Sequence, residues 1–262
     1  MTSYSHAMSS SPSLDSLFGL HGRTALVTGG TSGIGRGIAD ALAGAGARVL
    51  IAARTQSAID ETVAEIRAGG GVAEGIRADL AARAGAHALA GTVGEVDILV
   101  SCAGINLRPP MPELDETTWE ATMAVNLEAP FVLGQRLAPG MAERRYGRLI
   151  HISSQQAHRP FGNSGAYGVS KAAVEGLARV QAEAWSSQGV TANVLIPGFV
   201  RTPLNRETIS DPEVIDALAA RTLVGRNGLP EDFAGAAVFL AGPGSAYVTG
   251  QSIAVDGGFS VH

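Results

Sequence analysis

The chain has 262 residues, of which 45% are hydrophobic, and its formal net charge at pH 7 is −5. This composition excludes overall disorder, and the interspersed charges form no basic stripe for a nucleic-acid partner. Cys102 is the only cysteine, which excludes an intrachain disulfide and a multi-cysteine metal site. Every apolar run ends well short of the ~20 residues of a membrane span. We therefore expect a soluble, cytoplasmic protein without a bound metal or a membrane partner.

The first segment of the chain differs from the rest. Residues 1–20 are rich in serine and have neither the charged start nor the apolar core of a signal peptide. They predict a flexible N-terminal tail. No linker or change of composition interrupts the chain between Arg23 and Phe259. The sequence therefore predicts one dinucleotide-binding and catalytic domain over residues 21–262.

Short apolar runs alternate with helical periodicity along this domain. Helical spacing is seen, for example, at residues 38–46, 58–68 and 117–138. The predicted strands lie at residues 23–30, 47–54, 71–80, 96–104, 147–154, 190–198 and 251–258. This order predicts an α/β fold: a three-layer, Rossmann-like, doubly wound parallel sheet of seven strands, with helices on both faces. Ligands of such a sheet bind beyond the carboxyl ends of its strands.

A glycine-rich turn follows the first predicted strand. In GGTSGIG, the residues Gly29, Gly33 and Gly35 stand between this strand and a helix. Glycines let the backbone approach a ligand closely, and the amide groups at the helix start attract anions. The turn therefore predicts a pyrophosphate site, although its spacing is G-x-x-x-G-x-G. The alternative is an ordinary turn in a chain with 34 glycines.

Several motifs together resemble those of one family. TGGTSGIG is followed by SCAG at 101–104, Asn126, Ser154, Tyr167-x-x-x-Lys171 and PGFVRT at 197–202. This set resembles the single-domain branch of the short-chain dehydrogenase/reductase family over residues 22–259. The resemblance implies an NAD(P)-dependent oxidoreductase that interconverts a secondary alcohol and a ketone by hydride transfer.

The end of the second predicted strand bears on the choice of cofactor. Ala53 stands where an NAD-preferring fold usually has an acidic residue, and Arg54 follows, suited to a 2′-phosphate. We expect NADP, with NAD as the alternative, although Ser32 occupies a position where many NADP-dependent relatives have a second basic residue. By resemblance, the cofactor-binding residues are Gly29, Thr31, Ser32, Gly33, Ile34, Gly35, Arg54, Asp79, Leu80, Ala103, Gly104, Tyr167, Lys171, Pro197, Gly198, Val200 and Thr202.

The expected chemistry depends on Tyr167 and Lys171, which lie four residues apart on one face of a helix. Lys171 is the only lysine in the chain. A nearby cation favours the phenolate, so we expect a lowered pKa for Tyr167. The resemblance implies that Tyr167 is the general acid/base and that Lys171 also binds the nicotinamide ribose. It further implies that Ser154 binds the substrate oxygen, a part that Ser153 could also take, and that Asn126 holds a water that relays protons to the lysine.

Two residues depart from the family pattern. Cys102 replaces an asparagine that is common in the family, and it is interpreted as a buried small residue rather than a nucleophile. His151 replaces another common asparagine, in the fifth predicted strand, and it receives no functional interpretation.

The loops at 155–163 and 199–228 are expected to shape the substrate pocket. Gln155, Gln156 and Asn106 are the candidate substrate residues, and His158, Asn163 and Arg201 offer further polar groups. They favour a sugar, polyol or sugar acid, as in a gluconate 5-dehydrogenase-like enzyme. The alternatives are a 3-oxoacyl-carrier-protein reductase-like enzyme and a non-catalytic dinucleotide-binding sensor. The resemblance also implies a homotetramer, with residues 251–262 near a subunit interface.

Overall fold

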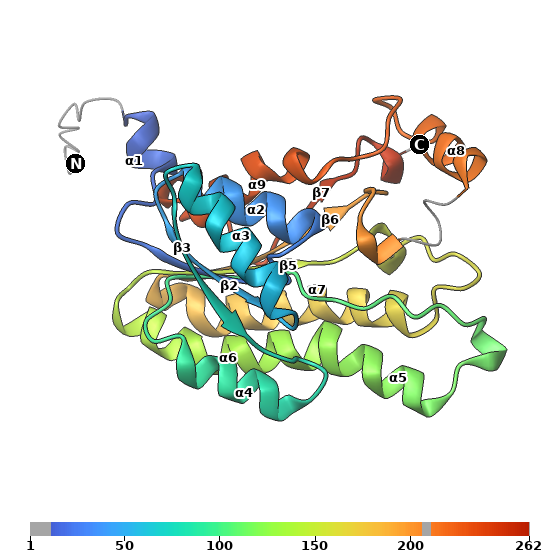
Figure 1. Ribbon diagram of the computed structural model, residues 1–262, viewed down its shortest axis with the longest axis horizontal. Helices are drawn as coiled ribbons and strands as arrows, with labels where there is room; N and C mark the ends of the chain where they lie inside the picture. The colour runs from blue at the N-terminus through green and yellow to red at the C-terminus, as the bar shows by residue number, and fades with distance from the viewer. Residues whose placement is uncertain (1–11, 206–210, 262) are drawn as a thin grey trace, which may run out of the picture.

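A parallel β-sheet forms the middle layer of the molecule in Figure 1, a computed structural model in which residues 12–205 and 211–261 are described. In this part of the chain the sheet has seven strands in the order β3-β2-β1-β4-β5-β6-β7, and all neighbours pair in parallel. The strands are β1 (Thr24–Thr28), β2 (Arg48–Ala53), β3 (Val72–Arg77), β4 (Ile98–Ser101), β5 (Gly147–Ile152), β6 (Val190–Pro197) and β7 (Ser252–Val255). The predicted doubly wound sheet is confirmed.

The direction of winding changes next to β1. Thr28, the last residue of β1, pairs with Ala52 of β2 on one side and with Ser101 of β4 on the other. The chain runs outward from β1 to β3 and then returns to place β4 beside β1. A crevice therefore opens beyond the carboxyl ends of β1 and β4, where doubly wound sheets bind their ligands.

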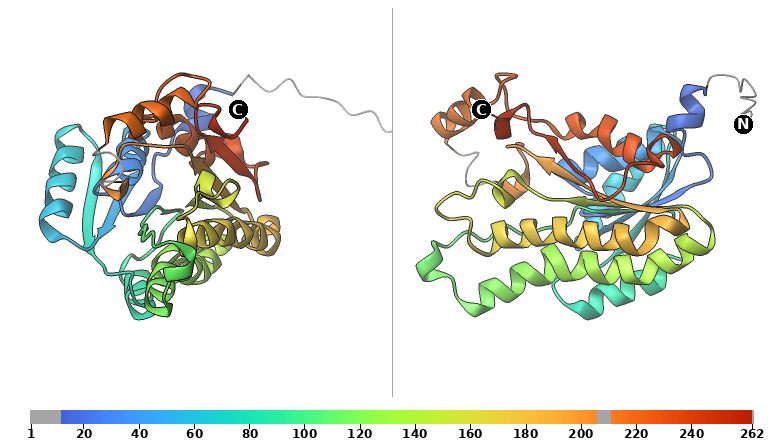
Figure 2. Two further views of the ribbon diagram at one scale, coloured as in Figure 1. Left: turned by 90° about the vertical axis from the view of Figure 1, so that its right-hand side faces the viewer. Right: turned by 180° about the vertical axis from the view of Figure 1, so that it is seen from behind.

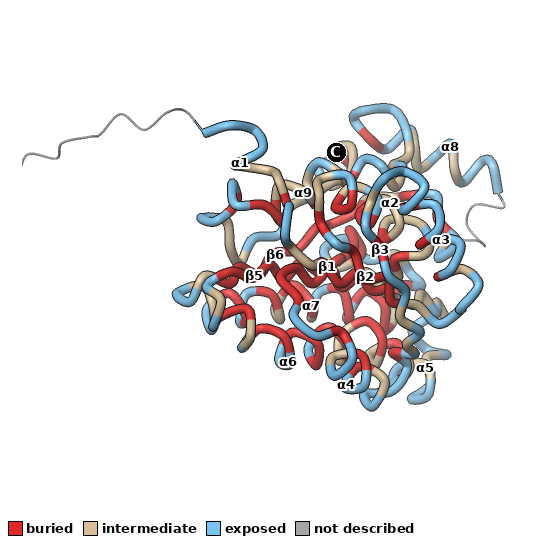
Figure 3. The backbone as a smooth tube through the Cα atoms, turned by 60° about the vertical axis from the view of Figure 1, so that its left-hand side comes forward, coloured by how far each residue is buried: buried red, intermediate tan, exposed pale blue. Residues whose placement is uncertain are grey.

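Helices cover both faces of the sheet, as predicted, and Figure 2 shows the three layers from two further sides. One face carries α2 (Gly33–Gly44), α3 (Gln56–Ala68) and α9 (Ala234–Ala241). The other carries α4 (Arg83–Thr92), α5 (Glu116–Met123), α6 (Ala129–Glu143) and α7 (Gly165–Trp185). Two short helices, α1 (Leu14–Phe18) and α8 (Pro212–Ala220), bury none of their residues and lie at the periphery in Figure 3.

Short helical turns occupy several connections. They are η1 (Met111–Glu113), η3 (Gln155–Ala157), η4 (Ser186–Gln188), η5 (Pro203–Asn205), η7 (Pro230–Phe233), η8 (Pro243–Ser245) and η9 (Phe259–Val261). Among these, η3 follows β5 directly and η5 follows β6, so both lie at the ligand-binding edge of the sheet.

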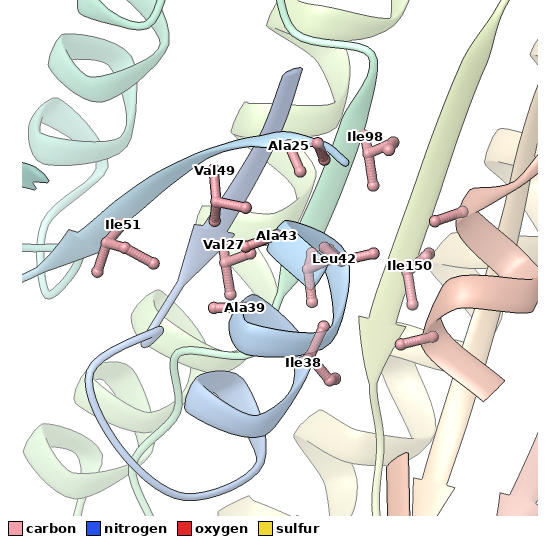
Figure 4. Close-up of a cluster of buried hydrophobic side chains, with 14 of the residues drawn as sticks. Ala25, Val27, Ile38, Ala39, Leu42, Ala43, Val49, Ile51, Ile98 and Ile150 are labelled. Atoms are coloured by element: carbon pink, nitrogen blue, oxygen red, sulfur yellow. The ribbon is translucent and has the colours of Figure 1, made fainter. Parts of the chain in front are cut away.

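Apolar side chains fill the space between the sheet and its helices. Figure 4 shows one such cluster, in which Val27 of β1 lies beside Ala39 and Ala43 of α2, while Leu42 points towards Ile150 of β5. Every residue of β5 and β6 is buried, as expected of strands covered on both faces. Within the described residues, no helix combines the length and hydrophobicity needed to cross a membrane.

The prediction of one continuous helix over residues 117–138 is wrong, because the helix is interrupted. A π-helical segment, η2 (Ala124–Glu128), separates α5 from α6. Asn126 in this segment is buried and bonds to residues distant in sequence, and such contacts stabilise a local widening that helical periodicity does not encode. Short π-helical segments are frequent at functional sites.

The predicted N-terminal tail falls partly outside the described residues. Residues 1–11 are not described, so their flexibility stays a prediction. In the remainder, the side chain of Ser13 caps α1 and Leu20 is buried, with its amide donating to the carbonyl of Ala45 at 2.8 Å. Residues 13–20 are thus attached to the α2 side of the molecule.

Candidate active site

A cavity of about 740 Å³ opens at the carboxyl ends of the strands, and a smaller one of about 230 Å³ adjoins it. The two share Gly29, Ser32, Arg54, Ala103, Gly104 and Ile105. The larger is lined by the predicted residues Gly33, Ile34, Gly35, Ala103, Gly104, Asn106, Ser154, Gln155, Gln156, Tyr167, Lys171, Pro197, Gly198, Val200 and Thr202. Thr31, Asp79 and Leu80 line the smaller. The structure therefore brings together the predicted site residues, except Asn126, which lines neither cavity.

The glycine turn between β1 and α2 fits a bound pyrophosphate. Gly29 and Gly33 have φ angles of +69° and +53°, which residues with a Cβ rarely adopt. A Cβ at Gly33 would also lie 2.9 Å from a methyl carbon of Thr202. Ser32 caps α2 without a side-chain hydrogen bond. The first amide groups of the helix therefore stay available to an anion, apart from that of Gly35, which bonds to Cys102. The turn thus has the backbone shape and the donors that a dinucleotide needs.

Arg54 follows β2 at the junction of the two cavities and is exposed. None of the ion pairs found among the described residues involves it. The side chain of Arg77, at the end of β3, donates to the carbonyl of Arg54 at 3.2 Å. Two guanidinium groups therefore lie near the end of β2, which gives this corner of the cleft a positive charge.

Tyr167 and Lys171 project from the first turns of α7, and both are buried. The ammonium nitrogen of Lys171 lies 5.6 Å from the centre of the Tyr167 ring and donates to the carbonyl of Ile152 at 2.8 Å. Burial lowers the pKa of Lys171 to about 8, although the nearby Cys102 raises it in part. The lysine thus binds the end of β5 while its charge faces the tyrosine.

The expected lowering of the tyrosine pKa is not found. Burial raises the pKa of Tyr167, and the Ser154 hydroxyl and the Arg108 charge oppose this effect only in part. The physical reason is desolvation, which disfavours the phenolate more than the neighbouring groups favour it. Tyr167 is therefore held as a neutral phenol at neutral pH.

The hydroxyls of Ser153 and Ser154 have different partners. Ser154 accepts from the amide of Gln156 at 3.2 Å, and its hydroxyl also acts on Tyr167. The Ser153 hydroxyl contacts the carbonyl of Lys171 at 3.0 Å and the carboxylate of Glu175 at 2.7 Å. Ser154 is therefore the serine whose hydroxyl faces the tyrosine.

Asn126 lies behind the cavity. Its Oδ1 accepts from the amide of Ile105 at 2.9 Å, and its Nδ2 donates to the carbonyl of Ile105 and to the hydroxyl of Ser170, both at 3.0 Å. A Cβ placed on Gly104 would lie 3.4 Å from Asn126 Oδ1 and 3.7 Å from Lys171 Nζ. The asparagine thus fixes the loop after β4 against α7, close to the lysine.

Cys102 and His151 are titratable groups with different surroundings. His151 is buried, but Cys102 is only partly buried, so the interpretation of Cys102 as a buried residue is corrected. Burial raises the pKa of Cys102 to about 11, which keeps the thiol neutral. Burial lowers the pKa of His151 to about 4, and its Nε2 lies 2.7 Å from Oε1 of Gln181. His151 lines neither cavity and is part of the interior, whereas the neutral thiol of Cys102 forms part of the wall of the larger cavity.

The predicted substrate residues divide into two groups. Gln155, Gln156 and Asn106 line the larger cavity, and Oε1 of Gln155 and Oδ1 of Asn106 are buried without a hydrogen-bond partner among the described residues. The other polar candidates, His158, Asn163 and Arg201, line neither cavity. Part of the predicted loop at 199–228, residues 206–210, lies outside the described residues.

Arg108 is a cavity residue that the sequence analysis missed. Its Nε is buried without a hydrogen-bond partner among the described residues, and its guanidinium lies 5.9 Å from the centre of the Phe161 ring. Its charge also acts on Tyr167. A signal was available, because Arg108 stands in the loop just after β4, at the edge where such sheets bind ligands.

Comparison with known proteins shows what this arrangement is similar to. A family model described as "Enoyl-(Acyl carrier protein) reductase" matches residues 29–260. Galactitol 2-dehydrogenase (L-tagatose-forming) of Cereibacter sphaeroides is 38% identical over 252 residues, 94% of this chain and 98% of that protein. Gluconate 5-dehydrogenase of Gluconobacter oxydans (strain 621H) is 36% identical over 254 residues, 94% of this chain and 97% of that protein.

A crystal structure extends the comparison to three dimensions. It is a gluconate 5-dehydrogenase from Burkholderia cenocepacia J2315 in complex with NADP and tartrate, and it is 36% identical to this chain with a TM-score of 0.88. The match covers 95% of this chain and 99% of that one.

Proposed function

This chain belongs to the short-chain dehydrogenase/reductase family, and from that premise we propose that its cavity interconverts a secondary alcohol and a ketone by hydride transfer. The observation that carries the proposal is the meeting of Ser154, Tyr167 and Lys171 in one cavity, beside a glycine turn that fits a dinucleotide. The enzyme is an oxidoreductase acting on CH-OH groups, like the relatives named above.

The cofactor is NADP, and NAD is the alternative. When bound, its nicotinamide ring supplies the hydride acceptor or donor. The glycine turn and the start of α2 hold the pyrophosphate, and Arg54 binds the 2′-phosphate, because a guanidinium suits a phosphate and Ala53 offers no carboxylate to a 2′-hydroxyl. NADP is present in the crystal structure of the Burkholderia relative, which supports this assignment.

Tyr167 is the general acid/base. Because burial raises its pKa, the phenol is protonated at neutral pH and donates its proton to the oxygen of a ketone. The Ser154 hydroxyl donates to the same oxygen and stabilises the charge that develops there. In the reverse direction, Ser154 and Arg108 favour the phenolate that must form.

Lys171 and Asn126 support this chemistry. Lys171 keeps a positive charge near the phenol below a pKa of about 8 and binds the nicotinamide ribose. Asn126 holds the loop after β4 in place through both of its side-chain groups. A water between Asn126 and Lys171 that relays the proton is part of this proposal.

The substrate is a hydroxylated acid, such as a sugar acid. Arg108 is half-buried and presents a guanidinium that can pair with a carboxylate, and the unpaired oxygens of Asn106 and Gln155 can accept from hydroxyl groups. Such a set matches gluconate, on which the Gluconobacter relative acts, and the tartrate bound by the Burkholderia relative. Sugars and polyols are the next candidates, as in the galactitol relative.

A 3-oxoacyl-carrier-protein reductase-like activity is the second candidate. The description of the matching family model names an acyl carrier protein, and apolar side chains of Leu107, Phe161 and Leu218 line the larger cavity. An acyl chain could lie against them. A non-catalytic sensor is disfavoured, since it would not need the Ser154, Tyr167 and Lys171 set.

The assembly is a homotetramer that works in the cytoplasm. Large apolar side chains are exposed on the outer helices, among them Phe131 of α6 and Val169 and Val180 of α7. Val261, in the C-terminal segment 251–262, is exposed as well. Contact between subunits through these surfaces would remove this apolar area from water.

A substrate panel tests the function. We expect turnover of hydroxylated acids with NADP and of their ketones with NADPH, slower rates with NAD and NADH, and little turnover of 3-oxoacyl thioesters. Tyr167→Phe should lower kcat at least about a hundredfold, since general acid/base groups contribute that much or more, while NADPH binding measured by fluorescence is retained. Tight NADPH binding without turnover of any carbonyl would contradict the proposal and favour the sensor.

A further inference from the structure

A buried carboxylate lies one helical turn beyond the catalytic lysine. Glu175 follows Lys171 by four residues on α7 and is only 3% exposed, yet it lines neither cavity. Extending the proposed function, we propose that Glu175 is a positioning residue that fastens the substrate loop 155–163 and the end of β5 to the helix of Tyr167 and Lys171.

The first contact is with the end of β5. The Ser153 hydroxyl lies 2.7 Å from Glu175 Oε1 and 3.0 Å from the carbonyl of Lys171. It thus joins the strand to two successive turns of α7. Ser154 is the next residue, so this contact sets the distance between the serine and the tyrosine that share the substrate oxygen.

The second contact is with the substrate loop. His158 Nε2 lies 3.0 Å from Glu175 Oε1. A carboxylate oxygen accepts, so Nε2 carries the hydrogen. The amide of His158 donates to the carbonyl of Gln155 at 3.1 Å, which links the histidine to the turn that presents Gln155 and Gln156 to the cavity.

The third contact reaches the last strand. The Ser252 hydroxyl of β7 lies 3.3 Å from Glu175 Oε2. The carboxylate therefore lies within hydrogen-bond distance of side chains from three separate segments, with the single hydrogen of Ser153 shared between Glu175 and the carbonyl of Lys171. Partners of this kind are what a buried carboxylate needs. The pKa of Lys171 is set by burial and by Cys102. We therefore assign Glu175 a role through hydrogen bonds that hold segments in place, and not through its charge on the lysine.

Three variants separate a hydrogen-bonding role of Glu175 from a role through its charge. Glu175→Leu keeps the volume but removes every acceptor. Glu175→Gln keeps one oxygen for Ser153 and His158 and offers its amide group to Ser252. His158→Ala removes only the loop contact, at a side chain that is 57% exposed, so the fold survives. Glu183→Leu, on the exposed side of α7, and His87→Ala, exposed on α4, are the matched controls.

The measurements are steady-state kinetics with the best substrate of the panel, and hydrogen exchange of peptide amides by mass spectrometry. We expect Glu175→Leu and His158→Ala to raise the KM for the alcohol about tenfold, because small displacements of positioning groups have effects of this order or larger. The KM for NADP should stay within about twofold. Amides of residues 155–163 should exchange faster, and Glu175→Gln should behave like the wild type.

Several results would overturn the inference. One is a normal KM for the alcohol together with unchanged hydrogen exchange at residues 155–163 in His158→Ala. This variant tests the inference even if Glu175→Leu does not fold. Another is an equal loss in Glu175→Gln and Glu175→Leu, which would point to the charge. A wild type that turns over no substrate would contradict the proposed function instead, and faster exchange in His158→Ala would still support the link.

Discussion

Lys171 shows how the surroundings of one residue set its chemistry. The side chain is 5% exposed, and its ammonium has a carbonyl partner at Ile152. Gly104 leaves room beside it, since even a Cβ there would lie 3.7 Å from the lysine nitrogen. A compact cation fits this space, whereas the wide fork of an arginine needs more. The one lysine of the chain therefore stands where a carbonyl group meets its ammonium and a glycine lies beside it.

The burial of this cation should cost stability. The fall of the Lys171 pKa from 10.5 to about 8 corresponds to about 3 kcal/mol at pH 7. Lys171→Met removes that cost and loses the bond to Ile152, so we expect the free energy of unfolding at pH 7 to rise by about 2 kcal/mol. Activity should be lost at the same time. Urea unfolding of both proteins measures the difference.

The sign of the pH dependence provides a check on this prediction. Between pH 8 and 10.5 the unfolded lysine holds a proton that the folded one has released, so wild-type stability rises with pH in this window. The advantage of Lys171→Met should therefore shrink from pH 8 to 10.5. An advantage that stays constant over this range would contradict the assignment.

The packing of α6 against α7 depends on a glycine. Gln181 of α7 bonds to His151 of β5, and its amide nitrogen lies where a Cβ at Gly134 of α6 would be. The two helices and the strand can therefore approach closely only without a side chain at residue 134. Local sequence pattern does not predict this close approach. It does not predict the π-helical segment either, because Asn126 there bonds to residues from distant parts of the chain.

Gly134→Ala should lower the free energy of unfolding by about 1–3 kcal/mol, because overpacking a buried contact forces side chains or backbone to shift. The control is Gly91→Ala in α4, where a Cβ meets nothing within 4 Å. That variant should gain up to about 1 kcal/mol from helix propensity. Thermal unfolding of both variants distinguishes the effects, and equal stabilities would show that Gln181 moves aside freely.

At the scale of the whole molecule, the outer face of α7 has the features of an interface. Val169 and Val180 are 46% and 68% exposed, and their spacing of eleven residues, three helical turns, places them on one face. Phe131 adds an exposed ring on the neighbouring helix α6. Large apolar side chains exposed on one side of neighbouring helices commonly mark a site of association.

The wild type should have the mass of a tetramer by light scattering at micromolar concentration. Val180→Asp should give smaller species, because a carboxylate in an apolar interface would be desolvated. Leu14→Asp, at an exposed leucine of the peripheral helix α1, should leave the mass unchanged. A monomeric wild type would refute the tetramer.

Much of the fold and of the site could be predicted from local pattern. The alternation of apolar runs and helical spacing indicated the parallel sheet, because strand and helix periodicities are written in consecutive residues. The glycine turn after β1 and the Tyr167–Lys171 pair are likewise short-range, since four residues along a helix already place two side chains on one face.

What the tertiary structure decided is burial and contact between distant segments. The raised pKa of Tyr167 follows from desolvation, which no motif reveals. The loop after β4, which contains Arg108, forms a wall of the larger cavity only because folding places it beside α7 and the loop after β5. Glu175 meets His158 and Ser252 across 17 and 77 residues of sequence. The sequence by itself determined the class of reaction, because the motifs that carry it are short. Folding decided the protonation state of Tyr167 and the contacts of Glu175, because both depend on what surrounds each residue.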